Sequence, residues 1–134
     1  MSRLDRYHDH GLLLLRVGIG AMFVLHGWPK VAGGAATWAK LGKAMAHLGL
    51  DLWPTAWGFM AAMSEFGGGI LLAAGLLFRP ACVALAGTMA VAAYMHMSKG
   101  DGFIKASHAI ESGILFVALI LVGPGKYSID ARRS

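Results

Sequence analysis

Cysteine, charge and internal repeats are what this sequence has least of. The chain of 134 residues holds one cysteine, Cys82, so an intramolecular disulfide and a CxxC redox pair are both excluded. Only 14% of the residues are charged, against about a quarter in a typical soluble domain. Many transporters are built from inverted repeats, so the lack of a visible repeat disfavours a carrier. Cys82 lies in an apolar run, and we interpret it as inert packing.

Long apolar runs take up most of the chain instead. Hydrophobic residues make up 57% of it, and its mean hydropathy is +0.60. Arg3 and Arg6 precede the first apolar run as in a signal sequence, but we interpret this region as the start of a retained transmembrane helix. The pattern predicts an all-α fold: an integral membrane four-helix bundle, one domain over residues 1–134, with spans at about 11–28, 55–78, 81–97 and 106–122.

The segment between the first two spans is too polar to cross a membrane. Gly33 and Gly34 break the helix before it, and apolar residues then recur at helical spacing at Trp38, Leu41, Met45 and Leu48. This pattern predicts an amphipathic helix. Two placements remain open, one in the membrane interface and one as a cap on the bundle.

The connections predict the topology. Arg79-Pro80 indicates a very short turn, so the second and third spans should be antiparallel neighbours. Four spans place both termini on one side of the membrane. That side carries six basic residues against five on the other, which favours cytoplasmic termini (Arg3, Arg6, Arg79, Lys126, Arg132 and Arg133 against Lys30, Lys40, Lys43, Lys99 and Lys105). Arg16 lies inside the first span, and we favour snorkelling to the headgroups over pairing with another helix.

Five ionisable side chains within the apolar runs are the most informative feature. Such groups are costly in hydrocarbon and mark a functional site by default. The topology brings all five into the half of the membrane remote from the termini: His26, Glu65, His96, His108 and Glu111. Glu65 shares a helix face with small residues, which predicts that it points into the bundle. Its structural alternative is an ion pair with Arg16 or a histidine.

Three motifs carry a family resemblance. His26-Gly27-Trp28-Pro29-Lys30 resembles the HG-x-x-K element of the DoxX family, and the chain from Glu65 through Gly68 and Gly75 to Arg79 resembles its E-x-GG element and the glycine and arginine that follow. Gly123-Pro124-Gly125-Lys126-Tyr127-Ser128-Ile129-Asp130 is similar to its closing segment. The resemblance implies a four-helix protein of the bacterial cytoplasmic (inner) membrane. Some DoxX-like and DoxD-like members are linked to membrane redox work, including thiosulfate:quinone oxidoreductase. Carried over by motif, the positions of interest are His26, Lys30, Glu65, Gly68, Arg79 and Asp130.

Our first functional hypothesis is a small membrane subunit that binds quinone and works with a redox partner. Quinone needs hydrogen-bond donors and a proton path, for which the candidates are His26, Lys30, Glu65, His96, His108 and Glu111. The expected pocket wall consists of Phe23, Trp28, Phe59, Phe66 and Gly68. No electron-carrying motif is visible, so a partner protein or larger complex is required, and no catalytic residue is assigned.

Two alternatives stay open. One is a structural or assembly subunit of a respiratory or oxidoreductase complex, with the polar cluster as a packing network and with Arg16, Arg79 and Asp130 in structural roles. The other, which we disfavour, is a metal or haem site on His26, His96 and His108. Membrane lipid is an expected partner and a homo-oligomer remains open. Nucleic acid is not expected, because the basic residues lie in ends and connections rather than in a patch.

Overall fold

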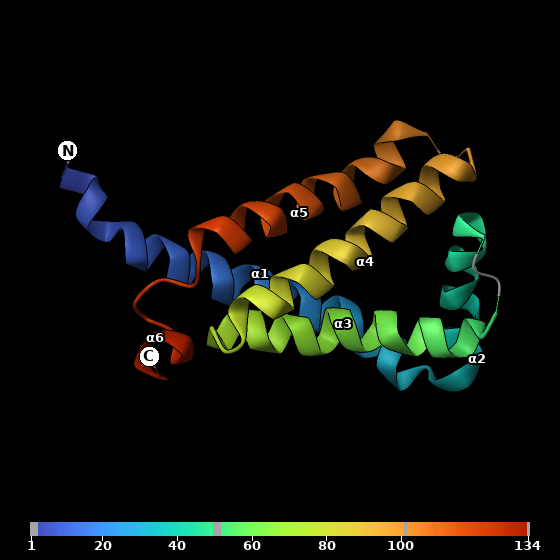
Figure 1. Cartoon of the computed structure of the whole chain (residues 1–134), viewed down its shortest axis with the longest axis horizontal. Coiled ribbons are helices and arrows are strands. Elements are labelled where there is room, and N and C mark those ends of the chain that lie inside the picture. Colours follow the sequence, from blue (N-terminus) through green and yellow to red (C-terminus); the bar gives the residue numbers. More distant parts are fainter. Residues whose placement is uncertain (1–2, 50–51, 101, 134) are drawn as a thin grey trace.

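The computed structural model describes residues 3–49, 52–100 and 102–133. Within them the chain forms helices without strands, as predicted (Figure 1). Four helices are long and apolar enough to cross a membrane, in segments Arg3–Ala32, Pro54–Ala74, Phe78–Ser98 and Phe103–Val122. The order of elements is η1 (Arg3–Tyr7), α1 (His8–Ala32), α2 (Gly34–Gly42), η2 (Lys43–Leu48), α3 (Pro54–Ala74), α4 (Phe78–Ser98), α5 (Phe103–Val122) and α6 (Ile129–Arg133).

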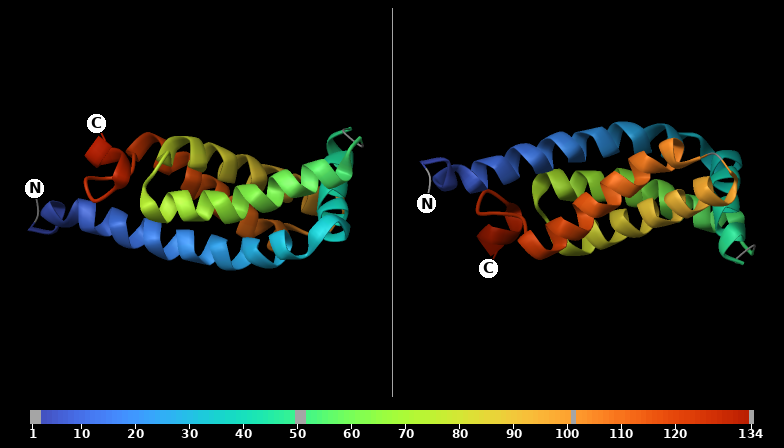
Figure 2. Two further views of the ribbon diagram at one scale, coloured as in Figure 1. Left: turned by 90° about the horizontal axis from the view of Figure 1, so that it is seen from below. Right: turned by 90° about the horizontal axis from the view of Figure 1, so that it is seen from above.

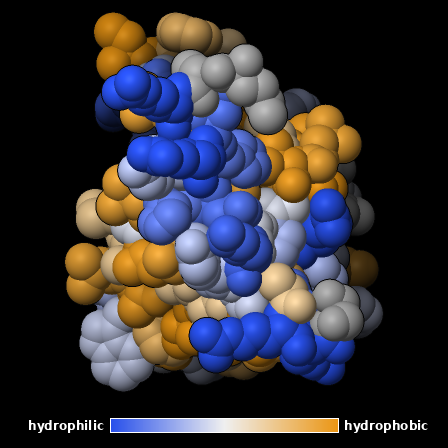
Figure 3. All heavy atoms as spheres, turned by 90° about the vertical axis from the view of Figure 1, so that its left-hand side faces the viewer, coloured by the Kyte–Doolittle hydropathy of each residue, from blue (hydrophilic) through white to orange (hydrophobic). Residues whose placement is uncertain are grey.

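The four long helices form two antiparallel pairs that cross each other. Helix α1 packs along α3 and α4 packs along α5, while α3 and α4 join the two pairs (Figures 1 and 2). Both termini lie at one end of the bundle, as predicted, and α2 and η2 lie at the other end. We call these the terminal end and the remote end. Seen from the terminal end, hydrophilic residues gather in the middle and apolar residues lie at the flanks (Figure 3).

Close contact between α1 and α3 depends on glycine. A Cβ atom at Gly20 would lie 2.6 Å from the carbonyl oxygen of Gly69, and one at Gly27 would lie 2.6 Å from the backbone nitrogen of Phe66. Neither backbone atom can move aside easily, so only glycine permits this spacing. Small residues are the usual means by which membrane helices approach closely.

The turn between α3 and α4 is not where the sequence predicted it. Helix α3 ends at Ala74, so the second span ends four residues earlier than expected, and the chain reverses over Gly75, Leu76 and Leu77. Gly75 and Leu77 have positive φ angles of 69° and 47°. Arg79 and Pro80 instead lie in the first turn of α4, where the missing N–H of proline costs no helical hydrogen bond. The prediction of an Arg79-Pro80 turn was therefore wrong, although the antiparallel pairing holds.

Other helices also begin or end at residues that differ from the predicted limits. Helix α1 extends from His8 to Ala32 and includes Pro29, so it is longer at both ends than predicted. Helix α5 begins at Phe103 but ends at Val122, as expected. Cys82 is fully buried in the apolar core beside Leu85, which confirms its role in packing.

The amphipathic segment divides into α2 and the 3-10 helix η2. It crosses the first turns of α3 at the remote end, so the cap that we left open as an alternative describes its position (Figure 2). Two glycines permit the crossing: a Cβ atom at Gly42 would overlap the carbonyl of Pro54, and one at Gly58 would overlap the carbonyl of Trp38. The side chain of Leu48, part of the predicted apolar face, lies outside the described residues.

Candidate functional site

A buried ion pair joins α1 to α3 near the remote end. The Lys30 Nζ atom donates to both carboxylate oxygens of Glu65, each 2.8 Å away. The Glu65 side chain is 8% exposed and the Lys30 side chain is 34% exposed. The prediction that Glu65 points into the bundle is confirmed. Its expected alternative partners were wrong, because the cation is Lys30 rather than Arg16 or a histidine.

The pair is attached to the remote cap through the backbone. Lys30 lies in the last turn of α1, where carbonyl oxygens have no partner further along the helix. The Trp38 Nε1–H group on α2 donates to the Lys30 carbonyl at 3.0 Å. The cap therefore holds the backbone that carries the lysine. Because the Nζ atom has three hydrogens and two contact Glu65, one remains to meet another acceptor.

Two of the predicted histidines lie beside each other on neighbouring helices. The ring centroids of His26 on α1 and His108 on α5 are 6.3 Å apart, and both residues are exposed. His26 lies four residues before Lys30 and so on the same side of α1. The Phe23 ring lies 6.4 Å from His26 and 5.0 Å from Phe116, so the histidine pair rests on the aromatic core.

The remaining predicted polar residues lie on α4 and α5. His96 is half-buried on α4 and Glu111 is exposed on α5. Among the described residues, no group of three or more His, Cys, Asp or Glu side chains is placed to hold a metal ion. The three histidines named for the disfavoured metal site are therefore not brought together.

The residues of the predicted aromatic wall lie in different surroundings. Trp28 packs on Phe66 at 5.6 Å, while Phe59 packs on Trp38 at 5.0 Å. Trp28 and Phe59 are exposed, at 56% and 44%. Phe23 instead lies in the core, and Gly68 faces Leu85 of α4, whose Cγ atom would be 3.0 Å from an added Cβ atom. The pocket wall therefore stays a prediction.

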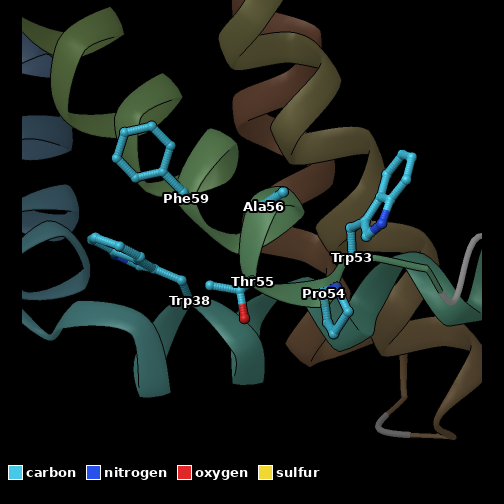
Figure 4. A pocket seen from close by; sticks show the side chains of 6 residues that line it. All are labelled: Trp38, Trp53, Pro54, Thr55, Ala56 and Phe59. Atoms are coloured by element: carbon cyan, nitrogen blue, oxygen red, sulfur yellow. The ribbon is translucent and has the colours of Figure 1, made fainter.

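A hollow of about 520 Å³ lies at the remote end, outside the ion pair. Trp38 of α2 and Phe59 of α3 stand on one side of the first turn of α3, and Trp53 stands on the other (Figure 4). Its lining is Trp38, Trp53, Pro54, Thr55, Ala56 and Phe59. A second hollow of about 470 Å³ lies at the terminal end, lined by residues of the α3–α4 turn and the C-terminal segment.

Arg16 does not reach the headgroups. It is 1% exposed, and its Nη2 atom donates to the carbonyl of Tyr127 at 2.6 Å. Within the described residues, its Nε and Nη1 atoms have no hydrogen-bond partner. Gly75 makes room for it, since a Cβ atom there would overlap Nη1. Snorkelling was the wrong prediction, because the C-terminal segment folds back over the terminal end and provides a partner inside the fold.

The other motif residues at this end connect the C-terminal segment to the helices. The Asp130 carboxylate accepts hydrogen bonds from the backbone N–H groups of Leu77 and Phe78, at 2.9 and 2.8 Å, and so caps α4. The Arg79 Nε atom donates to the carbonyl of Ile120 at 2.8 Å. The family motifs thus divide into a remote group around Glu65 and a terminal group around Arg16.

Sequence reasoning missed three participants. Trp38 was predicted as part of an apolar face, but its indole N–H also bonds Lys30. Asp9 accepts from the backbone N–H of Lys126 at 3.0 Å, and Tyr127 provides the carbonyl for Arg16. The role of a backbone carbonyl as an acceptor cannot be read from the residue type. A tryptophan that follows closely after a helix end is a usable signal, because its indole N–H can bond one of the unpaired carbonyls there.

Comparison with known proteins bears out the family resemblance. The DoxX family model matches residues 11–98, which include Arg16, Lys30, Glu65 and Arg79 but not Asp130. The inner membrane protein YqjF of Escherichia coli (strain K12) is 32% identical over 133 residues, covering 95% of each chain. No solved structure matches the chain.

Proposed function

The chain belongs to the DoxX family, and from that premise we propose that it is a small membrane subunit of a redox system that binds quinone beside Lys30 and Glu65. The observation that carries the proposal is the ion pair itself. A carboxylate and an ammonium inside a membrane bundle are costly to maintain, and such groups commonly serve binding or proton transfer. The inner-membrane location of the relative YqjF agrees with a lipid-soluble substrate.

The arrangement of donors fits a quinone head group. One carbonyl would accept the remaining hydrogen of the Lys30 ammonium, whose side chain is one-third exposed. The second quinone carbonyl would accept a hydrogen bond from His26 or His108. His26 lies on the same side of α1 as Lys30, and His108 lies beside it on α5. A histidine is a donor near neutral pH in one of its tautomers and in its cationic form.

The chemistry assigned to these residues is proton handling. Reduction of a quinone takes up two electrons and two protons. Lys30 would give a proton to one oxygen of the reduced quinone and a histidine would give one to the other. The exposed histidines would regain a proton from water at the remote end, and Glu65 would take up a proton and return it to Lys30. Electrons must come from a partner protein, because we assign no electron carrier to this chain.

An assembly role is the second candidate, and one observation favours it. The Lys30–Glu65 pair joins α1 to α3 directly, next to the close glycine contact at Gly27. A pair that only holds two helices together would need no ligand, and neither described hollow is lined by Lys30 or Glu65. The protein would then hold a larger complex together without chemistry of its own.

The test is quinone retention by the protein purified from native membranes in mild detergent. We expect near-stoichiometric quinone in the wild-type extract and at least tenfold less in Glu65→Gln. Without the carboxylate, Lys30 can turn toward water and no longer donates to the quinone, and a hydrogen bond from a charged group contributes about 1.5–3 kcal/mol. Lys99→Gln is the control, because it removes one charge from an exposed residue at the same end that is not among the quinone candidates. Equal retention in Glu65→Gln, or no quinone in the wild type, would contradict the proposal. Loss of co-purifying subunits with quinone unchanged would favour the assembly role.

A further inference from the structure

The hollow at the remote end has the character of a lipid site. It lies on the outside of the bundle where α2 crosses α3, and Trp53 and Phe59, which line it, are 74% and 44% exposed. Its volume of about 520 Å³ lies within the usual range of ligand sites, about 300–1,000 Å³. Its lining is apolar except for Thr55, so it suits a hydrocarbon chain.

The hollow is a fixed feature of the fold. Backbones of α2 and α3 touch at Gly42 and Gly58, so the two helices cannot slide together to close it. The Trp38 indole is held at both ends, by its N–H bond to the Lys30 carbonyl and by its edge contact with Phe59. A rigid aromatic wall of this kind loses little conformational entropy when a chain packs on it.

The charge around the hollow selects the head group. Between Lys30 and Pro54 the chain contains two further lysines, Lys40 and Lys43, against one acidic residue, Asp51. Both lysines are exposed on the segment that crosses the remote end. Helix α3 also begins here without a side-chain cap, so its partial positive charge adds to theirs. A zwitterionic lipid would gain little from this field.

We propose that this hollow binds an anionic phospholipid, with one acyl chain packed against the Trp38–Phe59 ring pair and the phosphate near Lys40 and Lys43. This site is separate from the Lys30–Glu65 pair and does not rest on the proposed quinone function. It also does not depend on which side of the membrane the remote end faces. Trp38 contacts both the hollow and the Lys30 backbone, so the bound lipid would stiffen the cap that holds the ion pair.

The experiment is native mass spectrometry of the delipidated, detergent-purified protein titrated with phosphatidylglycerol and, separately, phosphatidylcholine. We expect one phosphatidylglycerol to bind at a concentration at least tenfold below that for phosphatidylcholine. Replacing Lys40 and Lys43 by glutamine should weaken phosphatidylglycerol binding about fivefold for each lysine, or roughly 25-fold for both. The matched control replaces Lys99 and Lys105, exposed at the same end, and should leave binding unchanged.

A second variant tests the acyl site without removing charge. Ala56→Trp fills the hollow and should weaken both lipids, whereas Ala90→Trp on the exposed face of α4 should not. Circular dichroism and a monodisperse elution profile establish that each variant is folded. Equal affinity for the two lipids, equal loss in the Lys99 and Lys105 control, or normal binding in Ala56→Trp would each overturn the proposal.

Discussion

Removing Lys30 should destabilise the protein far more than removing the charge of Glu65. In Lys30→Met the carboxylate of Glu65, 8% exposed, is left inside the bundle without its cation. Breaking a fully buried pair costs about 3–5 kcal/mol, and since the Lys30 side chain is one-third exposed we expect about 2–3 kcal/mol here. In Glu65→Gln the lysine can turn toward water, so the loss should be about 1 kcal/mol.

The double variant separates a packing role from a chemical one. Lys30→Met with Glu65→Leu leaves no unpaired charge, so its stability should return to within about 1 kcal/mol of the wild type. The assay is reversible unfolding in mixed micelles, followed by far-ultraviolet circular dichroism. Lys99→Met, which alters an exposed lysine, is the control. If Lys30→Met costs no more than Glu65→Gln, or if the double variant costs the sum of the two, the buried-charge reasoning is refuted. Quinone retention should remain lost in the double variant even where stability returns.

Two further predictions concern the contacts that hold the helices together. Gly27→Ala should lower the free energy of unfolding by about 1–3 kcal/mol, because the added carbon meets the Phe66 backbone. Gly18→Ala, with open space around it, should be neutral or slightly stabilising. Thermal unfolding in detergent measures both variants, and equal shifts in the two would contradict the contact. Asp130→Ala should cost about 1 kcal/mol through the lost cap of α4, while Asp130→Asn should retain most of it; equal losses by the same assay would show that the cap is not responsible.

The general fold could be predicted from hydropathy, but the position of the turn between α3 and α4 could not. Four spans, shared placement of the termini and a separate amphipathic segment all follow from the length and order of the apolar runs. The α3–α4 turn did not, because Gly75 can adopt a positive φ angle while Arg79-Pro80 can also begin a helix. Proline after an apolar run signals an end or a start equally well, and only the packing of Asp130 on the helix start decides which.

The candidate site was predictable as a region but not as a set of contacts. The position of Glu65 on a face of small residues indicated that it is buried, and this is what the structure shows. Its partner depended on how far α1 continues past Pro29, and the predicted span ended at Trp28, so Lys30 was placed in the connection. The surroundings of the aromatic residues were unpredictable for a related reason: residues near one another in depth can lie on opposite faces of a helix pair.

The fold-back of the C-terminal segment also bears on how the protein is made. The Arg16 guanidinium and the Tyr127 carbonyl that it bonds are separated by 111 positions, nearly the whole chain. During synthesis α1 enters the bilayer long before residue 127 has been translated, so its arginine stays without this partner until the last segment arrives. The Arg16–Tyr127 bond can therefore form only when synthesis of the chain is nearly complete.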